Sequence, residues 1–416
     1  MKGPTHEPEH GPARGPESGP VSGQRLASLD AFRGFVILAM IWVNYVAGMS
    51  GIPYWLEHAG PHADGITLPD LVFPAFLFMA GMAIPLALRR DAAGGLTLPL
   101  LGRLLWRAGS LMVAGVVLAE AWRYDDAAAL LPRALYFTLF YGAMLLLWRQ
   151  GAPGGPARGW LFWLGAALMA ALLVLYRGKA GDGASSVYLQ HSWWGILGMI
   201  GWAYLVCGVL YLAVRGHDAA LWGWLLLLLA LYMGGTDGWL PVPKLLNEFV
   251  NVPQVLGSTS VNMLAGALAG RILLVQSPGA PGRAVWPLVA LALVLLAAGL
   301  LLRPLYGINK IHATAPYSLV CAGITLALFV LFYWLCDVRG RRRWCAWLVP
   351  AGGNALLAYV APDMWEQLAA LLHVPRVWWP LWQQGGAAGL LNAAVLALVM
   401  IWLAGIATRA GLKLRM

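Results

Sequence analysis

Hydrophobic and polar residues alternate along this chain in long blocks. Apolar runs long enough to cross about 30 Å of hydrocarbon as helices recur between polar segments. The twelve runs lie near residues 31–50, 70–88, 102–122, 131–149, 159–176, 193–214, 219–235, 255–275, 285–303, 315–336, 346–370 and 386–408. They predict an all-α polytopic membrane protein, a single bundle of about 12 transmembrane helices. Two runs are weaker than the others: 219–235 is short, and 346–370 contains Asp363 and Glu366.

Composition supports a membrane protein. The 416 residues are 60% hydrophobic and 11% charged, with a mean hydropathy of +0.69, whereas soluble domains carry about 25% charged residues. Residues 1–24 are rich in Pro, Gly and Glu and lack the apolar core of a signal peptide. We predict a disordered cytoplasmic tail over 1–24 and one transmembrane domain over 25–416.

The basic residues predict an orientation. The net charge of +10 comes from short clusters at the ends of the apolar runs, so we expect membrane lipids as partners and no nucleic acid. If the tail is cytoplasmic and the runs alternate, the inner segments hold twenty of the 28 Lys and Arg residues. Both termini are therefore predicted to be cytoplasmic, in a cell inner membrane, with the loop around His58 facing the periplasm.

A polar segment joins the first two runs and carries the first candidate chemistry. Asn44 ends the first run, His58 lies in the loop, and Asp70 begins the second run. A neutral imidazole can take a proton from an amine or hydroxyl, and an amide can donate to an acyl oxygen. His58 and Asn44 are therefore our candidate catalytic residues. The alternative is an ordinary interfacial histidine, with Asp70 favouring a helix N-terminus.

Further polar residues lie at the edges of later apolar runs. Polar groups in a bilayer are costly unless they pair or line a cavity. We therefore name as candidate substrate contacts Asp70, Ser258, Asn309, Lys310 and Asn354. The alternative for the run 255–275 is helix packing through its small residues, which include Gly266 and Gly270.

The inner side offers an arginine cluster. Arg33 follows Asp30 by three residues, so an ion pair on one helix face is the simplest interpretation. Together with Arg89 and Arg90, Arg33 is also our candidate for binding an anionic cofactor, although the positive-inside rule explains these arginines without a ligand. The four cysteines lack metal-ligand spacing, and we predict neither a metal site nor a disulfide framework.

Several motifs in fixed order resemble those of the heparan-α-glucosaminide N-acetyltransferase family, a group of transmembrane acyltransferases. The specific ones are SLDAFRG at 28–34, MIWVN at 40–44, YWLEH at 54–58 and DLVFPAFLF at 70–78. Weaker ones follow: VLGST at 255–259, GINK at 307–310, PYSL at 316–319 and GNALLAY at 353–359. The resemblance covers residues 25 to 370.

The resemblance implies transfer of the acetyl group of cytosolic acetyl-CoA, across the membrane, to the amine of a terminal glucosamine on the far side. His58 matches the catalytic histidine of the family and Asn44 matches its helix-end amide. The chain departs from the family in lacking a large lumenal N-terminal region and in its extra hydrophobic runs between residues 159 and 235. Both departures concern recognition of the acceptor, an amino sugar or related glycan.

Three questions stay open at this point. His58 could act as a general base, or it could carry the acetyl group itself. Two other functions fit the pattern: an O-acyltransferase of a periplasmic glycan, and a transporter with twelve helices and no catalysis. A homodimer is possible.

Overall fold

The computed structural model describes residues 26–149, 158–180, 186–190, 193–374 and 385–414; the predicted tail over 1–24 lies outside them. The described part is almost entirely helical. Its α-helices are α1 Ala27–Val46, α2 Leu68–Leu88, α3 Leu98–Ala119, α4 Arg133–Trp148, α5 Arg158–Leu175, α6 Gly195–Ala213, α7 Asp218–Thr236, α8 Lys244–Val250, α9 Ser260–Gln276, α10 Val285–Tyr306, α11 Ala315–Tyr333, α12 Val349–Gly352, α13 Ala355–Leu371 and α14 Gly386–Arg409.

Short elements connect these helices. Two-residue strands, β1 Gly178–Lys179 and β2 Ser186–Val187, pair antiparallel with Gly178 opposite Val187. Two π-helical turns extend long helices: η4 Pro253–Thr259 leads into α9, and η6 Trp334–Val338 continues α11. The 3-10 turns are η1 Tyr54–Leu56, η2 Ala92–Gly94, η3 Ala121–Arg123, η5 Pro281–Ala284 and η7 Arg343–Cys345.

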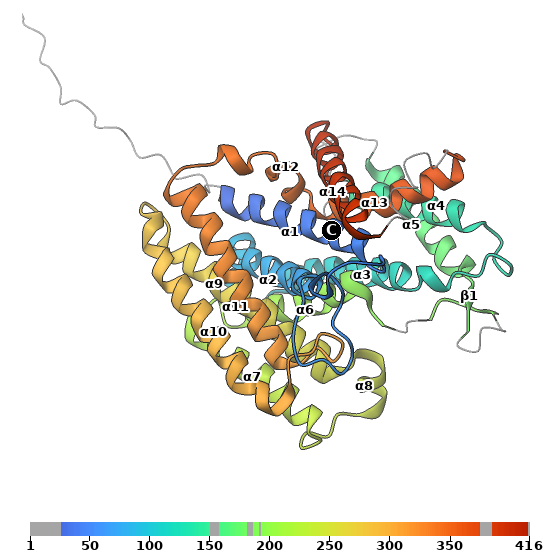
Figure 1. Ribbon diagram of the computed structural model, residues 1–416. Coiled ribbons are helices and arrows are strands. Elements are labelled where there is room, and N and C mark those ends of the chain that lie inside the picture. Colours follow the sequence, from blue (N-terminus) through green and yellow to red (C-terminus); the bar gives the residue numbers. More distant parts are fainter. Residues whose placement is uncertain (1–25, 150–157, 181–185, 191–192, 375–384, 415–416) are drawn as a thin grey trace, which may run out of the picture.

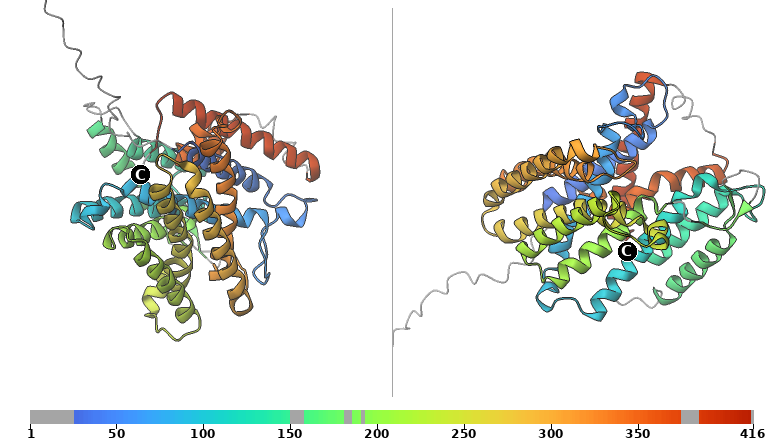
Figure 2. Two further views of the ribbon diagram at one scale, coloured as in Figure 1. Left: turned by 90° about the vertical axis from the view of Figure 1, so that its left-hand side faces the viewer. Right: turned by 90° about the horizontal axis from the view of Figure 1, so that it is seen from below.

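Helices α1 and α2 run through the middle of the molecule, with α9, α10 and α11 on one side and α4 and α5 on the other (Figure 1). Two further views show α14 beside α1 (Figure 2), and the Trp42 Nε1–H donates to the Leu390 carbonyl between them. The largest apolar core lies among α1, α2, α9 and α11. A second, aromatic core lies around α4 and α5, where Tyr136, Phe140 and Tyr176 are fully buried.

The predicted all-α architecture is confirmed, and each of the twelve apolar runs contains a helix. Among the described residues, nine helices are long and apolar enough to cross a membrane. Helices α4, α5 and α13 are shorter or less apolar than that standard. The run 346–370 does not form one continuous helix, because Gly353 and Asn354 separate α12 from α13. The count of twelve spans therefore stays a prediction.

Small residues bring α2 and α9 into close contact. A Cβ at Gly266 would lie 2.1 Å from the Phe78 carbonyl oxygen, and one at Gly270 would lie 2.3 Å from that of Met82. Both distances are too short for any side chain, so only glycine allows this approach. The packing interpretation of these two glycines is correct. It applies to the middle of α9, whereas the preceding turn η4 borders a cavity.

Candidate active site

His58 is held by a buried carboxylate at the start of α2. Its Nδ1 lies 2.8 Å from Asp70 Oδ1; the imidazole side chain is 46% exposed, and that of Asp70 is 0% exposed. An ionised carboxylate can only accept a hydrogen bond, so in the tautomer with the proton on Nδ1 the imidazole donates to Asp70. This tautomer leaves the Nε2 lone pair free to act as a base.

Asp70 is held in place by the cap at the start of α2. Asp70 is the third residue of α2, and its Oδ2 accepts from the Thr67 backbone N–H at 3.3 Å and from the Thr67 hydroxyl at 2.8 Å. The same oxygen accepts from the Ala59 N–H at 3.1 Å, and the Tyr317 hydroxyl donates to the Asp70 carbonyl at 2.6 Å. The capping residue of the helix thus also orients His58.

Lys310 completes this cluster from the loop between α10 and α11. Its Nζ lies 2.9 Å from His58 Nδ1 and 3.4 Å from Asp70 Oδ1. Burial lowers the pKa of the Lys310 ammonium, while the nearby Asp70 carboxylate opposes that shift. An ammonium only donates, so Lys310 can donate to an unprotonated Nδ1, or it pairs with Asp70 alone when Nδ1–H donates to that carboxylate. In both arrangements its charge balances the Asp70 carboxylate.

Hydrogen bonds join two loops that are distant in sequence, the loop after His58 and the loop before α11. Asn309 donates from Nδ2 to the carbonyls of Pro61 and Ala63, at 2.9 and 3.0 Å, and its Oδ1 accepts from the His312 N–H. Asp64 accepts from the Ile308 N–H at 2.7 Å and from the Arg303 guanidinium at 3.0 Å. These contacts hold the pKa of the Asp64 carboxyl below its usual value.

These bonds define the surroundings of one candidate substrate contact. Asn309 is 7% exposed, and both ends of its amide bond to backbone groups. Asn309 is therefore a positioning residue, which holds the loop after His58 against the loop before α11.

A cavity of about 680 Å³ opens beside His58. His58, Asn44 and Lys310 line it, together with apolar side chains of α1, α2 and α6. It extends along α1 to Met40 and along α2 to Leu77, which lie near the middle of these helices.

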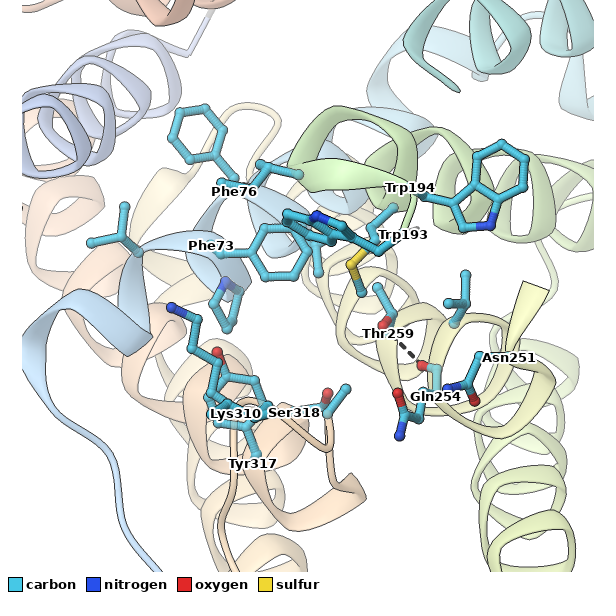
Figure 3. A pocket seen from close by; sticks show the side chains of 18 of the residues that line it. Phe73, Phe76, Trp193, Trp194, Asn251, Gln254, Thr259, Lys310, Tyr317 and Ser318 are labelled. Carbon is cyan, nitrogen blue, oxygen red and sulfur yellow. Dashed lines mark hydrogen bonds between the residues drawn. The ribbon is translucent and has the colours of Figure 1, made fainter. Parts of the chain in front are cut away.

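Another side of the cavity comes from later parts of the chain. Trp193, Asn251 and Gln254 line it, from the segments before α6 and before α9 (Figure 3). These segments, the His58 loop and the Lys310 loop therefore meet in one cavity.

Two other predicted contacts have different surroundings. Asn354 lies away from the cavity and is 1% exposed; its Nδ2 donates to Thr408 Oγ1 and the Leu412 carbonyl, and its Oδ1 accepts from the Leu414 N–H. It therefore fastens the end of the described chain to the start of α13. Ser258 is fully buried and bonds to the hydroxyl of Ser318, 2.8 Å away. Ser318 lines the cavity, so Ser258 lies behind the wall.

The candidate cofactor arginines lie at the other end of α1 and α2. Arg33 forms the predicted ion pair with Asp30, at 3.6 Å. Arg89 and Arg90 are exposed just after α2. None of the three lines the cavity, and at 1.5 Å per residue Arg33 lies about 16 Å along the helix axis from Asn44. The described structure therefore leaves their predicted role with an anionic group untested.

Two residues in the site were not singled out by sequence. Thr67 holds the Asp70 carboxylate, and the spacing T-x-x-D before an apolar run is the signal that would have found it. Trp193 lines the cavity, yet a tryptophan at the end of an apolar run is equally typical of a membrane interface. Only the fold distinguishes these roles.

Comparisons with known proteins agree with the motifs. Residues 25–147 match a family model described as a domain of unknown function (DUF5009). The heparan-alpha-glucosaminide N-acetyltransferase of Homo sapiens is 38% identical over 98 residues, and that of Mus musculus is 37% identical over 98 residues. Each alignment covers 23% of this chain and 14% of the relative. The matches support a relationship to these acetyltransferases, and this chain matches about a seventh of their length.

Proposed function

We propose that this protein is a membrane acetyltransferase that moves the acetyl group of acetyl-CoA to the amine of an amino sugar. The observation that carries the proposal is the His58–Asp70 pair, 2.8 Å apart on the wall of a cavity. Both residues lie within the segment that matches the family model. A buried carboxylate that orients an imidazole toward a cavity is suited to proton transfer in acyl chemistry.

The chemistry uses Nε2 of His58. It accepts a proton from the acceptor ammonium, and the freed amine nitrogen forms a C–N bond to the thioester carbonyl carbon. As the C–S bond breaks, the imidazolium gives this first proton to the departing thiolate. Neutral Nε2 then takes the second amine proton and passes it to solvent, so the products are the amide, free CoA and one proton. In the alternative route Nε2 attacks the thioester first and carries the acetyl group to the amine. Asp70 holds the same tautomer in both routes.

Asn44 is the proposed donor to the acyl oxygen. Its amide is exposed at the outer end of α1 and lines the cavity with His58. A neutral amide donor near the thioester carbonyl stabilises the negative charge that develops on that oxygen. Arg33, Arg89 and Arg90 are proposed to contact the CoA phosphates from the inner side, where guanidinium groups match phosphate geometry.

Sidedness is part of the proposal: both termini in the cytoplasm and the His58 loop in the periplasm. Single cysteines introduced at positions 60 and 245 should react with a membrane-impermeant reagent added outside, and a cysteine at position 94 only after the membrane is opened. Reaction of position 60 from the cytoplasmic side alone would contradict it.

A transfer assay tests the function. Purified protein is given labelled acetyl-CoA and a panel of amino sugars, hydroxyl-only sugars and no acceptor, and both free CoA and the labelled sugar are measured. The proposal expects labelled N-acetyl product that depends on the amino sugar. Label on sugar hydroxyls alone would indicate an O-acyltransferase. If no acceptor gives either free CoA or labelled product, the result contradicts acetyl transfer and favours a transporter.

A further inference from the structure

The cavity has a second polar wall that the acetyl-transfer chemistry does not use. It contains Asn251 and Gln254, which lie across the cavity from Lys310, and Trp193, whose ring lies between the two sides (Figure 3). All three lie outside residues 25–147, the segment that matches the family model. We call these three residues the amide wall.

The two amides are available for a ligand. Both side chains are half-buried, and within the described residues neither has a hydrogen-bond partner. Their backbone is fixed: Asn251 ends α8 with φ at 54°, and the Gln254 carbonyl accepts from the Thr259 hydroxyl at 2.9 Å. Each amide offers both donors and an acceptor, which matches the hydroxyl groups of a sugar.

Trp193 adds an aromatic face to these amides. Its ring lies beside that of Phe73 (Figure 3), and the residue is 46% exposed. The neighbouring Trp194 is anchored, because its Nε1 donates to the Phe249 carbonyl at 3.0 Å. This anchor fixes the backbone that presents Trp193. A flat apolar face in the same cavity as hydrogen-bonding amides suits a pyranose ring, which has an apolar C–H face and hydroxyls at its edge.

The charges around the cavity limit the kind of ligand that fits it. Four titratable side chains line it: His58, Lys310 and Tyr317 on the catalytic side and Glu248 near the amide wall. The Glu248 carboxylate lies 3.7 Å from the Lys244 Nζ. The amide wall itself contains neither Arg nor Lys. A sulfate or carboxylate bound at the amide wall would lie near the Glu248 carboxylate, whereas neutral hydroxyls there meet no like charge. The acceptor amine, bound at His58, lies near the Lys310 ammonium, and that like charge favours loss of its proton.

We propose that the amide wall binds the sugar ring of the acceptor, and that this acceptor is a terminal amino sugar with free hydroxyls and no sulfate or carboxylate. The inference rests on the proposed acetyl transfer and names its substrate more closely. It also assigns the choice of acceptor to a part of the chain outside the matched segment, so the acceptor need not be that of the mammalian relatives.

The test uses the purified full-length protein, with glucosamine as the probe and acetyl-CoA as the donor. Trp193→Ala, Asn251→Gly and Gln254→Ala should each raise KM for glucosamine about tenfold, the effect of losing one good contact. Glycine is chosen at position 251 because it keeps the left-handed backbone conformation. KM for acetyl-CoA should stay within about twofold. Trp239→Ala is the matched control, since Trp239 is 79% exposed and does not line the cavity.

Three outcomes separate the possibilities. Trp193→Phe should restore most of the glucosamine affinity, which shows that the aromatic face matters rather than the fold. An unchanged glucosamine KM in all three wall variants would overturn the inference, as would a rise confined to acetyl-CoA or a preference for glucosamine 6-sulfate. If the wild-type protein transfers acetyl to no amino sugar, the proposed function itself fails. Equilibrium binding of labelled glucosamine to wild type and Trp193→Ala then tests the wall alone, and equal or absent binding would overturn it.

Discussion

The two polar walls of the cavity are built in opposite ways. On the catalytic wall Asp70 holds His58, and Asp70 is itself held by Thr67 and Ala59. On the amide wall the backbone is fixed, but the side chains of Asn251 and Gln254 bond to no described residue. A pre-positioned group suits a proton transfer that needs one geometry. Amides without a partner suit recognition, because the ligand completes their hydrogen bonds.

The walls also differ in their relation to known proteins. Asn44, His58 and Asp70 lie in the segment that matches the family model, whereas the amide wall lies outside it. Variants of the catalytic wall should therefore lower kcat with every acceptor and leave acceptor KM nearly constant. Variants of the amide wall should do the reverse.

The largest effect is expected from His58→Ala. Removing a general base typically lowers the rate about 10²–10⁴-fold, and the loss should be the same for every acceptor. The protein should still fold, because the His58 side chain is nearly half exposed. His62→Ala is the control: His62 lies four residues on, is exposed and does not line the cavity. Wild-type turnover in His58→Ala together with an inactive His62→Ala would show that the wrong histidine was chosen.

Asn44→Ala should have the next largest effect. If the amide donates to the acyl oxygen in the transition state, its loss lowers kcat about 10²–10³-fold, with KM for glucosamine little changed. A kcat near that of the wild type with a tenfold rise in acceptor KM would mean that Asn44 binds the acceptor and does not stabilise the transition state. Asn44→Asp is a useful companion, because it keeps the size but loses the donor.

Asp70→Asn tests whether His58 needs its orienting carboxylate. The variant keeps an oxygen for the Ala59 and Thr67 donors, yet it no longer stabilises the Nδ1–H tautomer. We expect kcat to fall about 10²-fold with acceptor KM unchanged, and a thermal midpoint lowered by the unpaired Lys310. A purely structural carboxylate would instead give a lower midpoint and full turnover per folded molecule.

Much of the site was predictable because its residues stand where apolar runs are interrupted. Polar groups at such positions are costly unless they line a cavity or pair. His58, Asn44 and Lys310, from three separate segments, do line one cavity. The helices were predictable for the same reason, since a long apolar run in a membrane has few alternatives to a helix.

What the sequence could not predict is which polar residue bonds to which. Asn309 and Asn354 look as suitable for a ligand as Asn251 does. Asn309, however, bonds to backbone groups some 246 residues away and Asn354 to groups 54 to 60 residues away. Asn251 has no such partner among the described residues. An amide is free for a ligand only if the fold supplies no other partner, and that depends on tertiary contacts.

The smallest effect, and the most specific, is expected from Asp64→Asn. Asp64 contacts no part of the cavity and acts only by joining the His58 loop to Ile308 and Arg303. Small shifts of a catalytic group cost rate, so we expect kcat to fall only about three- to tenfold, again without a change in acceptor KM. A change in acceptor KM alone would mean that this clamp serves the amide wall instead.

The same substitution has a pH signature. The pKa of Asp64 is lowered in the folded protein, so the folded state binds fewer protons at this carboxyl than the unfolded chain does. Its contribution to stability is full above the usual aspartate value of about 3.9 and is lost as the pH falls through the lower folded-state pKa. Thermal midpoints of wild type and Asp64→Asn should therefore differ at pH 6 and converge below about pH 4. A gap that stays constant down to pH 3 would mean that the clamp depends on the shape of the side chain and not on its charge.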